Sequence, residues 1–424
     1  MSDFLHRAAE LDRADPLARC RAGFHLPTDT IYLDGNSLGP ISRRAEAALH
    51  RVAEEWRTLG IGGWLHANPP WLALPETIAA RLAPLLGAAP EQIALTASTT
   101  VNLHQLLATL FEPGAVRKAI LADELNFASD LHAIGSHLRL RGLDPARHLR
   151  KVRSRDGRTL DEEAIVAALT DDVQLAVLPA VLYTSGQWLD VSRITRRARA
   201  RGIVIGWDCS HSIGAVPHEL DDGDADFAFW CSYKHLNAGP GAVAGLYLNR
   251  RHFDRKPGLA GWWGVRADRR FALRHEHEPA DGAAALHIGT PHILSLAPLQ
   301  GALEDFADAG GIGPLREKSL ALTQLLLDAA KAELASLGIT LATPPEPARR
   351  GGHVALVHPE AWRLCQALRA AGVVADCRPP DILRLAPAPL YNSHGECVEA
   401  VARLRTILES GSHLAFPSTL APVT

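Results

Sequence analysis

The sequence predicts an α/β protein with a mostly parallel central sheet in a large domain and a smaller α/β domain toward the C-terminus. Its 424 residues exceed the roughly 250–300 at which a single hydrophobic core stops growing, which favours two domains. Apolar segments alternate with helical patterns between residues 150 and 250, as buried parallel strands and their crossover helices do. We expect an N-terminal helix and arm at 1–40, the large domain at 41–300 and the small domain at 301–424.

The elements follow from apolar periodicity and from breaks at Gly and Pro. Residues 1–30 predict an amphipathic helix and an irregular arm, and 35–40 is a loop because it is rich in Gly and Pro. Further helices are expected at 43–59, 191–201 and 294–309. Strands are expected from Ile93 and at 118–122, 173–178, 203–207 and 243–248. The second domain is expected to end near Ile407, followed by a poorly ordered or docked tail at 410–424.

Composition and charge limit the possible functions. A net charge of −3 gives no electrostatic reason to expect nucleic acid or an anionic membrane as a partner. The six cysteines form no C-x-x-C pair and are expected to be reduced thiols rather than a disulfide framework. Because the N-terminus is polar and no apolar run reaches membrane-spanning length, we expect a cytoplasmic protein.

Lys234 is the first candidate for chemistry. A lone lysine is most often a solvated surface charge. Six of the seven residues before Lys234 are apolar or aromatic, however, which indicates a short buried strand that carries an amine into the interior. The glycines of the following Asn237–Gly241 permit a ligand to approach the backbone closely. A desolvated lysine amine attacks carbonyl groups, as a lysine that forms a Schiff base must.

Asp208 is the second candidate, because it follows the apolar segment Ile203–Trp207. Open α/β sheets bind ligands at the carboxyl ends of their strands, so the carboxylate is expected at that edge. It could cap a helix, or it could pair with the protonated ring nitrogen that pyridoxal phosphate needs in order to store electrons. His211 lies three residues further on and could face the same ring.

These motifs resemble those of the kynureninases, pyridoxal-phosphate enzymes with an aspartate aminotransferase-like fold, also described as PLP-dependent transferase-like, and relatives of the class V aminotransferases. The matching segments are Leu33–Pro40 (LDGNSLGP), Trp207–Pro217 (WDCSHSIGAVP), Cys231–Gly241 (CSYKHLNAGPG) and Leu259–Gly264 (LAGWWG), and the likeness covers nearly the whole chain. The resemblance implies pyridoxal 5'-phosphate held as a Schiff base on Lys234 and a homodimer with shared active sites. It also implies hydrolysis of L-kynurenine, or of 3-hydroxykynurenine, to anthranilate or 3-hydroxyanthranilate and L-alanine, in tryptophan catabolism or NAD biosynthesis.

The resemblance also assigns roles to individual residues of the cofactor site. The cofactor-binding positions are Thr99, Thr100, Phe127, Ala128, Ser129, Asp130, Ser185, Asp208, His211, Tyr233, Lys234, Trp262 and Thr290. Catalytic roles fall to Lys234, Asp208 and Tyr233, the last as a proton donor. Thr99 and Thr100 match phosphate contacts but could equally cap a helix. Trp262 and Thr290 are expected to reach the phosphate from the other subunit, and Ala128 replaces the family's usual proline.

Four residues are carried over as substrate contacts: Asn36, Ser37, Trp64 and Arg384. Arg384 lies among alternating apolar residues, and its planar fork fits an α-carboxylate, although a structural salt bridge is the simpler interpretation. Asn36 and Ser37 could merely form a turn, and Trp64 could merely pack at the surface. No metal site is expected, because the histidines of Arg274–Glu278 lack the helical spacing of a zinc site.

Two other kinds of protein remain as alternatives. One is another enzyme of the same fold, such as a cysteine desulfurase or an aminotransferase. Desulfurases usually place a histidine where this chain has Tyr233, and no cysteine lies in a glycine-rich loop here. The other is a catalytically silent dimeric regulator, which the presence of Asp208, Lys234 and Arg384 disfavours.

Overall fold

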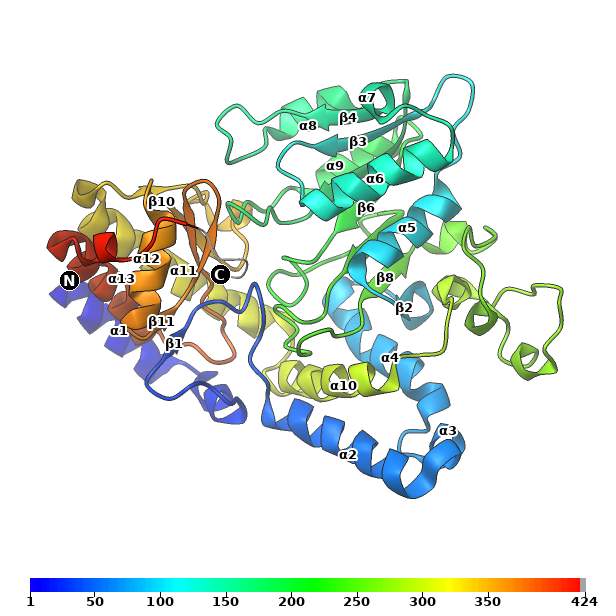
Figure 1. Ribbon diagram of the computed structural model, residues 1–424, viewed down its shortest axis with the longest axis horizontal. Coiled ribbons are helices and arrows are strands. Elements are labelled where there is room, and N and C mark those ends of the chain that lie inside the picture. The colour runs from blue at the N-terminus through cyan, green and yellow to red at the C-terminus, as the bar shows by residue number, and fades with distance from the viewer. Residues whose placement is uncertain (420–424) are drawn as a thin grey trace.

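The larger part of the molecule is built around a seven-stranded sheet (Figure 1). The computed structural model describes residues 1–419, so the last five residues of the expected small domain and tail lie outside the described residues. The strand order is β2 (Ile93–Leu95), β8 (Gly245–Leu248), β7 (Phe227–Trp230), β6 (Val204–Asp208), β5 (Val173–Pro179), β3 (Ala119–Asp123) and β4 (Leu149–Val152). β8 alone runs opposite to the other six strands, which confirms the mostly parallel sheet.

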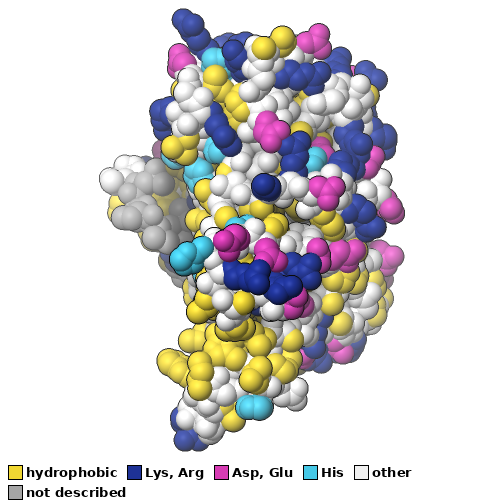
Figure 2. Space-filling view, turned by 90° about the vertical axis from the view of Figure 1, so that its right-hand side faces the viewer, with side chains coloured by type: hydrophobic (Ala, Val, Ile, Leu, Met, Phe, Trp, Pro, Cys, Tyr) yellow, Lys and Arg dark blue, Asp and Glu magenta, His cyan; other side chains and the backbone are white. Residues whose placement is uncertain are grey.

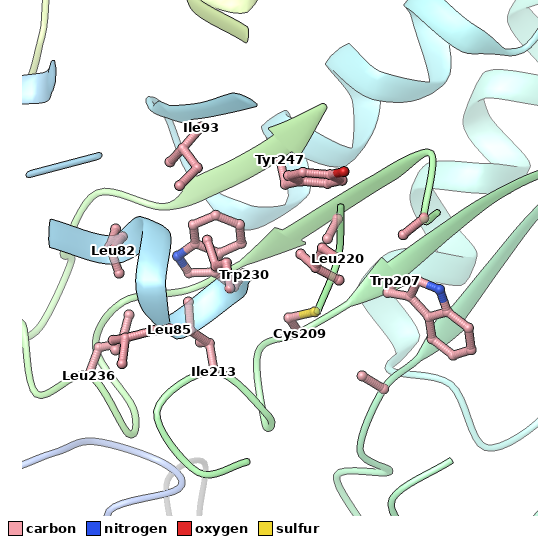
Figure 3. Packing of buried hydrophobic residues seen from close by; sticks show 14 of the residues in the cluster. Leu82, Leu85, Ile93, Trp207, Cys209, Ile213, Leu220, Trp230, Leu236 and Tyr247 are labelled. Atoms are coloured by element: carbon pink, nitrogen blue, oxygen red, sulfur yellow. The ribbon is translucent and has the colours of Figure 1, made fainter. Parts of the chain in front are cut away.

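Helices cover both faces of this sheet. Buried side chains of α5 (Thr99–Leu110) and α6 (Ala128–Leu140) form the core on one face. The core on the other face contains α4 (Leu74–Leu86), α8 (Glu162–Ala168), α9 (Val191–Arg199) and α10 (Ile293–Asp308). Figure 3 shows part of this second core, where Trp230 lies beside Leu82 and Leu85 of α4 and Tyr247 lies on the neighbouring strand. The continuous apolar composition of the strands follows from this double coverage.

Further helices lie at the ends and edges of the larger sheet. α2 (Arg43–Leu59) has the predicted bounds and lies along α10 at the lower edge of Figure 1, with α3 (Gly63–His66) beyond it. The short α7 (Pro145–His148) precedes the edge strand β4. The predicted boundary at residue 300 falls inside α10, which packs on α2 and α4.

A second, smaller sheet has its own hydrophobic core (Figure 1). Its order is β12 (Asp376–Arg378), β13 (Ile382–Leu385), β10 (Val354–Val357) and β9 (Thr340–Leu341), all antiparallel. The helices α11 (Ile312–Leu334), α12 (Ala361–Ala370) and α13 (His394–Ser410) pack against it. No helix within residues 1–419 is long and apolar enough to cross a membrane.

The N-terminal arm belongs spatially to this smaller part. α1 (Ser2–Ala14) packs on α13, and β1 (Ile31–Tyr32) pairs in parallel with β11 (Val373–Val374). The α-amino group of Met1 also pairs with Glu333 on α11. The arm therefore lies against the C-terminal helix α13, as the neighbouring labels of α1 and α13 in Figure 1 show.

Candidate active site

Lys234 lies just beyond the carboxyl end of β7, at the edge where ligands bind in parallel sheets. The strand ends at Trp230, earlier than the apolar run predicts, and a turn carries Lys234 into a partly buried position. Its Nζ lies 2.8 Å from Nε2 of His211. The pKa of His211 lies well below its ordinary value, mainly because the ring is buried and also because the charge of Lys234 is close. His211 is therefore neutral, and its Nε2 accepts a hydrogen bond from the lysine.

The predicted loop Gly35–Pro40 packs directly against the lysine turn. Gly39 N donates to the carbonyl oxygen of Tyr233 at 2.8 Å. A Cβ on Gly39 would lie 2.1 Å from Asn237 Oδ1 and 2.6 Å from the Lys234 carbonyl oxygen, so only glycine fits. Asn237 itself has a φ of +55°, in the left-handed region that asparagine tolerates better than most residues. Two of the sequence motifs thus meet in one contact.

Asp208 is the last residue of β6, where the sequence placed it just after the strand. It is buried, and one carboxylate oxygen accepts from Ser210 N at 2.8 Å. Burial raises the pKa of Asp208, and the hydrogen bond from Ser210 and the charge of Lys234 oppose this shift. Asp130 on α6 is also buried, and burial and the charge of Asp208 raise its pKa well above the ordinary value.

The buried carboxyl groups around Asp208 can stabilise a cofactor ring that carries a proton. Asp123 adds a third buried carboxyl at the end of β3, where burial raises its pKa to about 7. In the described part of the chain, one oxygen of Asp130 and Nδ1 of His211 are buried without a hydrogen-bond partner. Buried carboxyls that lack partners are stabilised by a cation or a hydrogen-bond donor. The donor set therefore fits a cofactor whose ring nitrogen carries a proton.

Two helix N-termini meet beside this group and can receive an anion. Ser98 and Phe127 precede α5 and α6, and neither helix start has a side-chain cap. The Oγ1 of Thr100 and the Oγ of Ser129 lie 2.7 Å apart and join the two starts. The uncapped N–H groups and the positive dipole ends favour a phosphate here, rather than the capping role that the sequence left open.

Phe127 forms an aromatic wall of the site and remains half exposed. Its ring centroid is 6.0 Å from Lys234 Nζ and 5.5 Å from the ring of Tyr183, edge to face. Tyr183 in turn lies 6.3 Å from His211. Tyr233 is half-buried, with its ring 6.0 Å from Lys234 Nζ, and burial raises the pKa of its hydroxyl, which therefore stays protonated.

The substrate-side residues gather around Arg384 on β13. Arg384 is fully buried, and its Nε donates to Asp376 Oδ1 at 2.7 Å. Its Nη2 also donates to Asp376 and to Ser37 Oγ (3.2 Å), and its Nη1 donates to the Tyr183 carbonyl at 2.6 Å. Asn36 is buried between Asp34 and Arg384. The internal salt bridge that the sequence left open is present, and Arg384 is also bonded to the backbone of Tyr183, whose ring packs on Phe127.

Four predicted residues lie apart from this group. Trp64 packs on Trp71 and Trp263, with centroids 5.8 and 5.5 Å apart, and Trp262 and Thr290 are exposed. Among the described residues, none of these predicted side chains forms a hydrogen bond or ring contact with Lys234. Ser185 is buried in its own turn, where its Oγ accepts from the backbone N of residue 187 at 3.3 Å.

Several residues of the site were not predicted as site residues. Tyr183 stands in the same strand exit as Ser185, so its position was a usable signal. Asp376 pairs with Arg384 across strands and also with Arg378 on its own strand, and the sequence gives no sign of that register. His353 is fully buried 6.0 Å from the ring of His211, although 142 positions separate them in the chain (353 − 211).

Comparison with known proteins shows where this site belongs. The family model of the kynureninase C-terminal domain matches residues 315–404. A kynureninase of Geobacillus thermodenitrificans is 50% identical over 412 residues, which cover 97% of this chain and 96% of that protein. Kynureninases of Bacillus cereus and Shouchella clausii are 50% and 47% identical over 409 residues, covering 96% of this chain and 95% of each relative.

Solved structures share the fold at much lower identity. A cysteine desulfurase of Thermococcus onnurineus has a TM-score of 0.78 at 18% identity and covers 92% of this chain and 98% of its own. A C-DES variant with glycine linked to its PLP cofactor has a TM-score of 0.79 at 18% identity, covering 91% of this chain and 98% of its own. These neighbours confirm the predicted fold class. Because the chain is 50% identical to curated kynureninases over nearly its whole length, it belongs to the kynureninase family and is a pyridoxal-phosphate-dependent hydrolase.

Proposed function

We propose that this chain hydrolyses the Cβ–Cγ bond of L-kynurenine, 3-hydroxykynurenine or both, giving anthranilate or 3-hydroxyanthranilate and L-alanine. The observation that carries the proposal is the Lys234 amine, hydrogen-bonded to a neutral His211 at the strand edge that ends in Asp208. The reaction consumes one water and needs no redox partner. It would serve tryptophan catabolism or NAD biosynthesis, in the cytoplasm.

Pyridoxal phosphate would be held by the residues that converge at this edge. Lys234 would carry it covalently, Asp208 would face the ring nitrogen, and Phe127 would lie on the ring. Thr99, Thr100, Ser129 and the N–H groups of Ala128 and its neighbours at the two helix starts would receive the phosphate, with Asp130 and His211 beside the ring. When bound, the cofactor supplies an electron sink for bond cleavage beside the α-carbon.

Two side chains of this protein, Lys234 and Tyr233, would carry out the proton transfers. Lys234 would move the α-proton, because its amine is within hydrogen-bond reach of an imidazole that can accept from it. Tyr233 would donate a proton near the cleaved bond, since burial keeps its hydroxyl protonated. Arg384, with Asn36 and Ser37, would hold the carboxylate end of the substrate.

A cysteine desulfurase on the same fold is disfavoured by the thiols. A nucleophilic cysteine needs an accessible thiolate. All six cysteines lie within the described residues, and five of them are buried. Burial raises the pKa of Cys20, the remaining partly exposed one. None of them is suited to accept sulfur from a substrate.

We also propose a homodimer in which Trp64, Trp262 and Thr290 complete the partner's site. Figure 2 shows hydrophobic side chains gathered at the lower end of one face, below a band of charged side chains. Exposed apolar residues at the end of α2 and in the turn between α2 and α3 include Trp56 (61%) and Ile61 (85%). Clustered exposed apolar residues of this kind mark association surfaces. Sedimentation of the wild type and of Ile61→Asp tests this, and a monomeric wild type would exclude it.

The activity is tested with purified protein supplied with pyridoxal phosphate. Incubation with L-kynurenine should release anthranilate and alanine in equal amounts, and a parallel assay with 3-hydroxykynurenine measures the ring preference. Lys234→Ala should abolish turnover and the borohydride-sensitive absorption of the lysine-linked cofactor, whereas Lys331→Ala, an exposed lysine on α11, should change neither. A Lys234→Ala variant with normal turnover would contradict the proposal.

A further inference from the structure

The middle of α5 carries a buried glutamine whose side chain bonds two separate loops. The amide oxygen of Gln105 accepts from Leu259 N at 3.0 Å. Its amide nitrogen donates to the carbonyl oxygens of Leu259 at 2.9 Å and of Leu286 at 3.1 Å. A glutamine side chain has two N–H donors, and these two carbonyls take both. One side chain thus ties α5 to the loop around Leu259 and to the segment around Leu286.

The next turn of α5 extends the same contact. Thr109 is four residues after Gln105, so both side chains lie on one face of the helix. The Thr109 Oγ1 donates to the Gln105 carbonyl at 2.7 Å and accepts from Gly258 N at 3.0 Å. A Cβ on Gly258 would lie 2.3 Å from the backbone of Ala108. The loop backbone therefore lies directly on the helix.

The two loops that Gln105 holds also pack on each other. A Cβ on Gly261 would lie 2.1 Å from the carbonyl oxygen of Ile288, so this contact leaves no room for a side chain. The segments 258–264 and 284–290 therefore form a single unit, which we call the loop pair. The side-chain bonds from α5 attach the loop pair to the helix.

The loop pair carries Trp262 and Thr290, which are proposed above to complete the partner's site. Trp262 stands three residues after the bonded Leu259, and Thr290 stands four residues after Leu286. Trp262 is 41% exposed and Thr290 is also exposed, so a second copy can contact both. The phosphate end of the chain's own site is open as well, because Phe127 beside it is 48% exposed. The exposed loop pair and the open phosphate end are therefore suited to each other in a dimer.

We propose that Gln105 is a positioning residue for the cofactor phosphate in the partner's site, because it fixes the loop pair that carries Trp262 and Thr290. Thr109 assists by holding the start of the loop pair. The same helix then serves two sites, since its N-terminus receives the phosphate of its own chain. The inference rests on the proposed function, in which the loop pair crosses to the partner.

The test measures the affinity for pyridoxal phosphate, read from the absorption of the Lys234-linked cofactor as it is added to dialysed protein. Gln105→Leu replaces the amide with an apolar group of similar size and removes three hydrogen bonds. Displaced crossing residues lose about one charge-assisted hydrogen bond to the phosphate, so the dissociation constant should rise about tenfold or more. With saturating cofactor, kcat should fall less than about threefold, because the phosphate contacts bind but do not react.

Hybrid dimers purified through two different affinity tags decide in which chain Gln105 acts. In the first hybrid, one subunit carries Gln105→Leu and the other carries Lys234→Ala. The one reactive lysine then faces a loop pair held by an intact Gln105, and its affinity should equal that of the wild type. In the second hybrid, one subunit carries both substitutions and the other is wild type. Its lysine faces the loosened loop pair, and its affinity should match that of the Gln105→Leu homodimer.

Gln92→Leu is the matched control, because Gln92 is also buried and its amide bonds the backbone of Ala89 and the carboxylate of Asp221 rather than the loop pair. It should lower the stability to urea without changing the affinity for the cofactor. If Gln105→Leu fails to form dimers, Thr109→Val takes its place in both hybrids, because it removes the bond to Gly258 and leaves the glutamine in position.

A Gln105→Leu homodimer with wild-type affinity would overturn the assignment. A weak first hybrid or a tight second hybrid would do the same, because the effect would then not pass from one chain to the other. A wild type that sediments as a monomer would instead refute the proposed dimer. A wild-type dimer that binds the cofactor but does not cleave kynurenine would refute the proposed activity alone, so the failures are distinguishable.

Discussion

Replacing Arg384 with alanine tests how strongly this arginine supports the fold. The substitution removes four hydrogen bonds and leaves Asp376, which is fully buried, with Arg378 as its remaining cation. Breaking a buried ion pair from one side costs about 3–5 kcal/mol, and we expect the lower end because Arg378 stays. In addition, kcat/KM for kynurenine should fall by about thirtyfold to several thousandfold, since the group proposed to hold the substrate's carboxylate is lost.

Urea unfolding followed by tryptophan fluorescence measures the stability of each variant with and without cofactor. Arg384→Lys should recover part of the stability, because the charge opposite Asp376 is kept. The double variant Arg384→Met, Asp376→Leu should be more stable than the alanine variant, because no buried carboxylate is left without its main partner. An alanine variant that unfolds at the wild-type urea concentration would show that the ion pair is not structural, and the reasoning would be wrong.

Three further predictions concern the other parts of the molecule. Asp208→Asn should lower kcat on the order of a hundredfold while cofactor affinity changes much less, and equal rates would make Asp208 a structural cap. Burial lowers the pKa of His218 to about 4. The stability that its neutral imidazole contributes is therefore complete above pH 6.5 and is lost as the pH falls toward 4, because the unfolded chain takes up the proton first. His218→Gln should therefore flatten the decline of the unfolding free energy in that interval by up to about 3 kcal/mol. Gly39→Ala should reduce turnover, since its Cβ would displace Asn237 or the Lys234 turn, and a crystal structure with an unmoved turn would contradict this.

The larger sheet and the positions of Lys234 and Asp208 were predictable because the relevant signals are local. Continuous apolar runs mark strands buried on both faces, and parallel strands present their carboxyl ends at one edge, so residues that follow two such runs must lie close together. The observed strands β5 and β6 agree with the predicted ones to within a residue at each end. The uncapped start of α5 also follows the predicted strand and hydroxyl-rich turn.

The remaining features depend on contacts between distant segments, which the sequence alone does not specify. The pairing of Asp376 with Arg384 requires the β12–β13 register, and a shift of one residue would turn one of them to the other face. The pairing of β1 with β11, which attaches the arm to the smaller sheet, requires knowledge of where both segments run. Tyr183 joins the site through contacts with distant residues: its carbonyl meets Arg384, and its ring lies against Phe127 and His211.

The loop that begins after β1 explains how these distant contacts act together. Leu33 pairs on both sides within the smaller part, since its N donates to Val374 and its carbonyl accepts from Ala386. Four residues later Ser37 bonds the arginine pair, and two residues after that Gly39 bonds the Tyr233 carbonyl beside Lys234. The distance between Arg384 and the amine of Lys234 is therefore set by a short, doubly anchored segment. A free amino acid with an aryl side chain can be placed over that amine only if this spacing is kept, which gives a physical reason for the small and polar residues of the loop.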